Sequence, residues 1–121
     1  MTLFWVFLGG GIGAGVRYGL TLLLPTANYP WPTLTANLLG CCAIGWLVGH
    51  YAQADWFVNQ GRALLVTGLL GGFTTFSAFS LETIQLAQAG QVGTALGYVL
   101  ISVGICLFGA WLGLEIGGSS V

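Results

Sequence analysis

The stretch GGFTTFSAF, residues 71 to 79, lies inside a long apolar run where a membrane helix would be expected to continue. Gly71 and Gly72 each weaken a helix by about 1 kcal/mol relative to alanine, and the β-branched Thr74 and Thr75 lose side-chain freedom there. Broken backbone at mid-membrane is tolerated only against protein, a cavity or an ion. The sequence therefore predicts an interrupted helix with a ligand site beside it. The alternative is a kink repaired by threonine hydroxyls that bond back to the helix.

The composition indicates whether the chain is surrounded by water or by lipid. Of its 121 residues, 56% are hydrophobic and 4% are charged, which is typical of an integral membrane protein. A hydrocarbon core of about 30 Å requires about 20 apolar residues per helix. We therefore expect an all-α fold with a single four-helix transmembrane domain over residues 1–121. Its expected spans are residues 3–24, 33–52, 63–87 and 92–116.

The charged residues give no basis for a single orientation in the membrane. The chain has no lysine, and its two arginines, Arg17 and Arg62, fall near opposite ends of the expected bundle. The positive-inside rule therefore has nothing to act on. We expect copies to insert both ways, which would allow an antiparallel dimer. The alternative is that another protein of the insertion machinery fixes one orientation.

Glycine is unusually frequent, with 21 copies. Many of them recur at four-residue spacing, which lets membrane helices approach closely. The sets are Gly11, Gly15 and Gly19; Gly45 and Gly49; Gly68 and Gly72; Gly109, Gly113 and Gly117. Four helices offer few partners to one another, so we expect an oligomer, although some of these glycines will serve packing inside one bundle.

Aromatic rings and hydroxyl groups follow the expected break on one face of the second half-helix. Matching polar side chains occur on the second and fourth spans. Donors on several helices, with almost no charge, suit a dehydrated path for a small anion that many weak sites can pass along. Phenylalanine can contribute because its ring edge is the positive end of the quadrupole. The residues concerned are Phe76, Phe79, Ser80, Thr83, Asn37, Tyr98 and Ser102.

The cysteines and the single histidine do not form a recognisable reactive or metal centre. Cys41 and Cys42 are adjacent in the second span and Cys106 lies in the fourth, with no histidine or carboxylate near them in the sequence. We interpret them as small apolar packing residues, and His50 as a polar residue at the membrane interface. No nucleophile motif or phosphate loop is present, so we do not expect an enzyme.

Three segments together resemble the Fluc family of fluoride channels, also called CrcB. They are GGGIGAGVRY (residues 9–18), PTLTANLLG (residues 32–40) and GLLGGFTTFSAF (residues 68–79). The resemblance implies passive export of fluoride across the inner (plasma) membrane, which relieves fluoride toxicity. It also implies an antiparallel homodimer with two pores and a structural Na⁺ ion at the dimer centre. No nucleic-acid partner is expected.

The resemblance also suggests roles for individual residues. Arg17 would attract anions into a vestibule, or would instead cap helix ends. The backbone carbonyls of Gly71 and Thr74 from each subunit would hold the sodium. Cys106 falls where a further pore hydroxyl would be expected. The fluoride pore would be lined by Phe76, Phe79, Asn37, Ser80, Thr83, Tyr98, Ser102, Thr33 and Glu82.

The charge of Glu82 beside an anion path leaves two possibilities, because the carboxyl group could be protonated when buried or could turn toward water at the pore mouth. Two other functions also remain open. A small proton-coupled exporter of lipophilic cations needs an acidic residue deep in the membrane, and Glu82 is the only candidate for it. A subunit that only assembles with others would use the glycine faces and not the polar stripe.

Overall fold

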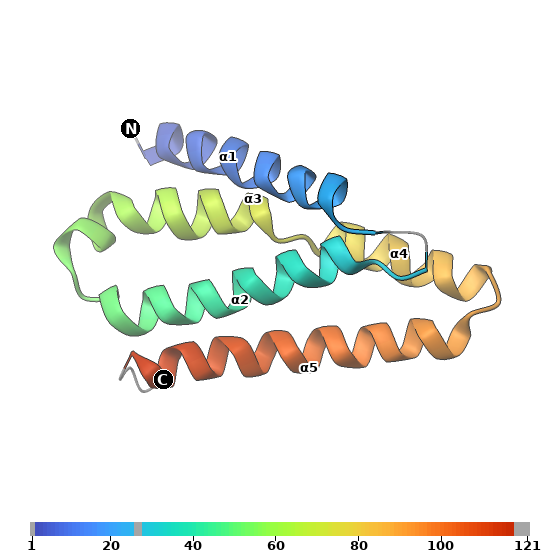
Figure 1. The fold of residues 1–121 in the computed structure, drawn as a ribbon. Helices are drawn as coiled ribbons and strands as arrows, with labels where there is room; N and C mark the ends of the chain where they lie inside the picture. The colour runs from blue at the N-terminus through green and yellow to red at the C-terminus, as the bar shows by residue number, and fades with distance from the viewer. Residues whose placement is uncertain (1, 26–27, 118–121) are drawn as a thin grey trace.

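The structure is a computed structural model that describes residues 2–25 and 28–117 (Figure 1). Within those ranges it is all-helical and contains no strand. Four helical segments are long and apolar enough to cross a membrane, so the chain is a multi-pass membrane protein. The helices are α1 (Thr2–Leu23), α2 (Trp31–Tyr51), η1 (Phe57–Leu70), α3 (Gly71–Phe73), α4 (Phe76–Gln88) and α5 (Val92–Ile116).

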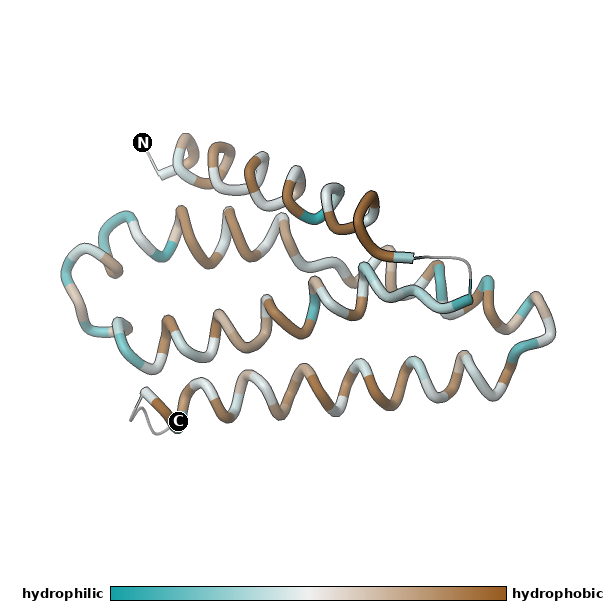
Figure 2. Tube along the Cα trace, in the orientation of Figure 1, coloured by the Kyte–Doolittle hydropathy of each residue, from teal (hydrophilic) through white to brown (hydrophobic). Residues whose placement is uncertain are grey.

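The four crossings lie alongside one another in a bundle (Figure 1). The most extensive packing joins α2 to α5 and α1 to η1, while α4 contacts α5 beyond the break in the third crossing. Apolar residues predominate along the helices, and hydrophilic residues gather toward the two ends of the bundle (Figure 2). This distribution fits helices whose middle portions face hydrocarbon.

Glycines bring the paired helices into backbone contact. A Cβ atom added to Gly113 would lie 2.6 Å from the backbone nitrogen of Trp46, and one added to Gly9 would lie 2.7 Å from that of Leu69. The contacts of α1 are therefore made by Gly9 and its neighbours on the same face. The expected α1 set of Gly11, Gly15 and Gly19 has nothing within 4 Å of such an added atom, so it faces away from the rest of the protomer.

The interruption predicted in the third crossing is present at Thr74 and Thr75. Both residues are extended, with φ −87° and ψ 159° for Thr74 and φ −153° and ψ 125° for Thr75. The helix before the break starts earlier than the sequence indicated, at Phe57 instead of residue 63. Polar residues of its first turns hid this start, because a span predicted from hydropathy begins only where the apolar run begins.

Candidate functional site

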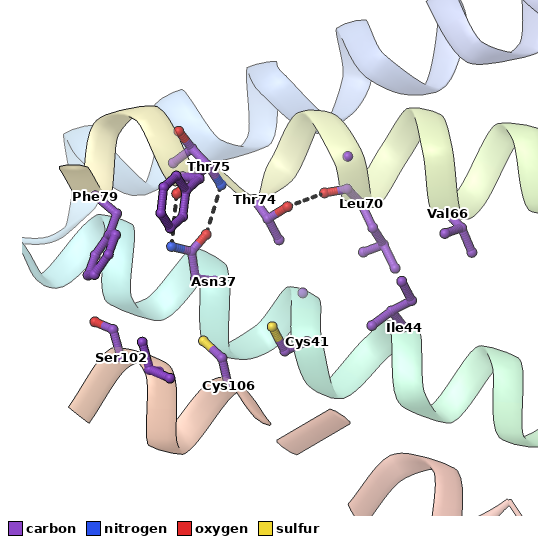
Figure 3. Close-up of a pocket in the computed structure, with 14 residues that line it drawn as sticks. Asn37, Cys41, Ile44, Val66, Leu70, Thr74, Thr75, Phe79, Ser102 and Cys106 are labelled. Carbon is purple, nitrogen blue, oxygen red and sulfur yellow. Dashed lines mark hydrogen bonds between the residues drawn. The ribbon is translucent and has the colours of Figure 1, made fainter. Parts of the chain in front are cut away.

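The break is held open by a side chain from another helix. Asn37 on α2 accepts a hydrogen bond from the Thr75 amide at 2.8 Å through Oδ1 and donates one to the Thr75 carbonyl at 3.0 Å through Nδ2 (Figure 3). One amide side chain thus satisfies both backbone groups of an extended residue. Unsatisfied, each group would cost several kcal/mol at this depth. Asn37 therefore stabilises the break, besides lining the cavity next to it.

Two further contacts cap the half-helices on either side of the break. Thr75 Oγ1 accepts a hydrogen bond from the Ala78 amide at 3.1 Å, which is an N-cap for α4. On the other side, Arg17 Nε donates to the Gly72 carbonyl at 3.1 Å. The Arg17 guanidinium thus caps the C-terminal end of α3, which is the second of the two roles considered for it. Its attraction of anions into a vestibule stays a prediction.

The rearranged hydrogen bonds free two carbonyl groups from the helical pattern. In a continuous helix the Gly71 carbonyl would accept from the Thr75 amide and the Thr74 carbonyl from the Ala78 amide. Those two amides bond instead to Asn37 Oδ1 and to Thr75 Oγ1. Unwound carbonyls of this kind are the ligands that broken membrane helices offer to Na⁺. The residues present therefore fit a sodium site at the break.

A cavity of 340 Å³ opens beside the break. It brings together six of the residues assigned from the sequence to the pore or to the sodium site, on three different crossings (Figure 3). Ser102 is 5% exposed, and its Oγ has no hydrogen-bond partner among the residues that the structure describes. A buried hydroxyl without a partner is costly, so this cavity suits a small acceptor. The six residues are Asn37, Gly71, Thr74, Phe76, Phe79 and Ser102.

Aromatic rings form a row that begins at this cavity. The centroids of Phe76 and Phe79 are 5.5 Å apart, and those of Phe79 and Tyr98 are 5.1 Å apart, with interplanar angles of 48° and 51°. Phe79 is 8% exposed, whereas Phe76 is 78% exposed on the single chain. Tilted rings present edges as well as faces to their surroundings. The sequence-predicted pair is thus adjacent, but only one ring is enclosed by its own chain.

Glu82 ends this row of rings, in a small hydrogen-bonded cluster. Its Oε2 accepts from the Thr33 hydroxyl at 3.0 Å and its Oε1 accepts from the Tyr98 hydroxyl at 3.1 Å. Each oxygen of the Glu82 carboxyl thus has one hydroxyl partner from its own chain, and the residue is partly buried. The two possibilities considered from the sequence, a protonated carboxyl and one turned toward water, both stay predictions.

Two of the expected pore residues, Thr83 and Ser80, do not line the cavity. The Thr83 hydroxyl donates to the Phe79 carbonyl at 2.8 Å, within its own helix. A threonine hydroxyl that bonds back to its own helix in this way is the alternative expected for the break. Thr74, at the break, makes the same kind of bond, to the Leu70 carbonyl at 2.9 Å. Ser80 is partly buried on α4. Both residues follow Phe79 along the same helix, so their contribution to a pore stays a prediction.

The structure adds two residues that the sequence did not identify for the site. Thr75 was considered only as a residue that weakens the helix, yet it forms the cap and receives Asn37. Tyr29, between α1 and α2, packs edge-on against Tyr98 with centroids 5.4 Å apart. Burial raises the pKa of the Tyr29 phenol above 10.0, which keeps it a neutral donor. A tyrosine in a proline-rich turn carries no periodic pattern that could have indicated this contact.

A broken membrane helix beside a cavity with a buried hydroxyl is typical of channels and transporters. Comparison with known proteins gives the family. Residues 4–114 match the family described as CrcB-like protein, Camphor Resistance (CrcB). The chain therefore belongs to the CrcB family, and it is not an enzyme.

Similar proteins match nearly the whole length of the chain. One is the Fluoride-specific ion channel FluC of Methylobacillus flagellatus, 44% identical over 115 residues, which cover 92% of this chain and 90% of the relative. The proteins of the same name from Paracoccus denitrificans and Thermus thermophilus are each 44% identical over 119 residues. For both, the match covers 96% of this chain and 94% of the relative.

Proposed function

We propose that this protein is a fluoride channel that lets fluoride leave the cell passively across the inner (plasma) membrane and so relieves fluoride toxicity. The observation that carries the proposal is the buried Ser102 hydroxyl, which has no partner among the described residues and borders the same cavity as Phe79. The names of the relatives support it, because they are described as fluoride-specific ion channels.

Conduction requires that water lost by the ion be replaced at each step. Burying a bare ion costs tens of kcal/mol, of the order given by Born solvation. Ser102 offers a hydroxyl donor, and the edges of Phe79 and Phe76 offer weakly positive hydrogens. Because none of these groups carries a full positive charge, the ion is not held too tightly to leave.

The Glu82 cluster fits the far end of this path. Its carboxylate accepts the hydrogen bonds of the Thr33 and Tyr98 hydroxyls. These hydroxyls would therefore donate to fluoride only when the carboxylate turns away or takes a proton. Fluoride and the carboxylate would compete for the same two donors. This competition would weaken the hold of these two donors on fluoride, so that the ion is able to leave.

The working form is an antiparallel homodimer with two pores. The 78% exposure of Phe76 supports this, because a pore ring must be enclosed by something and its own chain leaves it open. A second copy across the break would cover it. A structural Na⁺ ion at the centre of the dimer would be held by the Gly71 and Thr74 carbonyls of each subunit, with Asn37 and Thr75 Oγ1 holding the competing amides away.

Efflux from liposomes that contain the purified protein tests this function. We expect fast release of fluoride, measured with a fluoride electrode, and no release of chloride. Proton-driven uptake of a lipophilic dye cation without fluoride flux would instead identify the small cation exporter. Glu82 argues against that alternative, because both of its oxygens are engaged by hydroxyl groups of the same chain. Absence of both fluxes would favour the remaining alternative, a subunit that only assembles with others.

A further inference from the structure

Two cysteines from different helices meet in the cavity beside the break. Cys41 on α2 and Cys106 on α5 both line it, and both sulfur atoms point into it (Figure 3). The two thiols therefore face the same space from two different helices. The helices that carry them form one of the tightest pairs in the protomer, because a Cβ atom added to Gly113 would lie 2.6 Å from the backbone of α2. The extensive packing of α2 against α5 therefore keeps Cys41 and Cys106 on adjacent helices.

The same cavity holds a polar atom that lacks a partner. Ser102 lies four residues before Cys106, so the two side chains share one face of α5. Ser102 is 5% exposed, and no described residue hydrogen-bonds its Oγ. Two sulfur ligands and one free hydroxyl therefore converge on space that a small ion can enter.

The chemistry of these atoms selects the ion. Thiolates favour soft metal ions, and the described residues contain no group of three or more histidine, cysteine or acidic side chains that could complete a tetrahedral zinc site. Two thiols fit a soft ion that takes two ligands in a line. We propose that Cys41 and Cys106 form a two-thiolate site for a soft divalent cation, for which Hg²⁺ is the fitting probe.

The charge balance favours a divalent ion over a monovalent one. Each thiol loses a proton to water and each sulfur forms one bond to mercury, so two thiols and Hg²⁺ give a neutral S–Hg–S unit and two released protons. A monovalent ion would leave a net negative charge in apolar surroundings, which is costly. No oxidation or reduction takes place.

Occupation of this site has a consequence for the proposed channel. The ion would stand between α2 and α5 next to Ser102 and in the cavity that Phe79 also lines. It would block the path and link the two helices covalently. The effect on flux rests on the proposed function, whereas binding of the metal does not.

The chain contains its own control in Cys42. This residue is adjacent to Cys41 but borders a different, apolar cavity, where a Cβ atom added to Gly109 would lie 2.7 Å from its sulfur. Neighbouring helical residues point in different directions. Cys42 therefore offers a single thiol and no second ligand.

Binding is measured on the full chain in detergent, in the Cys42→Ser background. The protein is incubated with HgCl₂ and passed through a desalting column with a competing monothiol, and retained mercury is measured by elemental analysis. We expect one mercury per chain, with an ultraviolet mercury–thiolate absorption band. Cys41→Ser and Cys106→Ser, each added to that background, should retain none. Equal retention in either variant, or none in the background protein, would overturn the proposal; size-exclusion elution shows that each variant is folded.

The flux test compares each protein with itself, before and after HgCl₂. Fluoride efflux from liposomes should be almost abolished by mercury in the wild type and in Cys42→Ser, and should be unchanged by it in Cys41→Ser and Cys106→Ser. If mercury inhibits fluoride efflux only in the proteins that retain Cys42, the assigned site is wrong. If the untreated wild type releases no fluoride, the proposed channel function fails, while the binding measurement still decides the metal site.

Discussion

At the scale of single residues, the two phenylalanines after the break occupy different environments. Phe79 is enclosed against Tyr98, whereas Phe76 is open on the protomer. A channel built from ring edges needs both, because each edge replaces only part of the lost water. Because each ring edge is only one of several weak partners of the ion, its loss should lower the rate of passage without abolishing folding.

We predict that Phe79→Ile and Phe76→Ile each lower fluoride efflux by about tenfold, since the positive ring edge is lost while the volume is roughly kept. The measurement is efflux from liposomes at matched protein content. Phe108→Ile is the control, because Phe108 is a 59% exposed ring on α5 that borders neither cavity. Normal efflux in both test variants would remove the rings from the mechanism.

Asn37 carries the most specific pair of hydrogen bonds at the break. In Asn37→Asp the acceptor for the Thr75 amide is kept, but the donor to the Thr75 carbonyl becomes a second acceptor. We predict a loss of about 1–3 kcal/mol in stability, the usual cost of an unsatisfied buried group. Thermal unfolding in detergent measures it.

The matched control is Asn59→Asp, at an exposed position near the start of η1. It makes the same chemical change away from the break and should leave the unfolding midpoint within the experimental error. If Asn37→Asp unfolds at the same temperature as Asn59→Asp, the two hydrogen bonds do not stabilise the break.

At the scale of the elements, the sequence predicted the interruption but not what maintains it. Gly71, Gly72, Thr74 and Thr75 indicated weak helix between residues 71 and 79, and the break lies inside that range. The partner, Asn37, is 38 residues away from Thr75, and no local pattern can assign a long-range contact of that kind. The stripe on α4 was predictable from helical periodicity, whereas the packing of Tyr29 against Tyr98 depends on the conformation of a turn.

We predict that Thr75→Val destabilises the protein by about 0.5–2 kcal/mol, the usual value for the loss of an N-cap. Valine keeps the shape and the β-branch of threonine but removes the oxygen that accepts from the Ala78 amide. Thermal unfolding in detergent gives the size of the effect. Thr75→Ser retains the oxygen and should unfold close to the wild-type temperature; equal loss in both variants would show that the methyl group matters and the cap does not.

At the scale of the whole molecule, the sequence indicated an assembly but not which glycines would form it. Gly9 turned out to pack inside the protomer, whereas Gly11, Gly15 and Gly19 face outward. One helix therefore carries two small-residue faces. Periodicity alone could not separate them, because choosing the inward face requires knowing which neighbour α1 packs against.

Orientation in the membrane is the property of the whole molecule that the proposed antiparallel dimer most depends on. The chain has no lysine and only two arginines, Arg17 beside the break and Arg62 near the start of η1, so basic residues give little bias toward one orientation. The turn after α2 contains Gln53, and the turn after α4 contains Gln91, at the other end of the bundle. A lysine at either position should tip the balance, because the end that carries it will stay in the cytoplasm.

We predict that Gln53→Lys and Gln91→Lys each drive the C-terminus to one face of the membrane, opposite for the two variants, as read by a tag that reports its side. Each variant alone should show little fluoride efflux, since antiparallel partners become rare, and co-expression of the two should restore it. Gln53→Glu is the control, because acidic residues contribute little to orientation. Full efflux from a variant whose tag lies entirely on one face would exclude the antiparallel dimer as the conducting form.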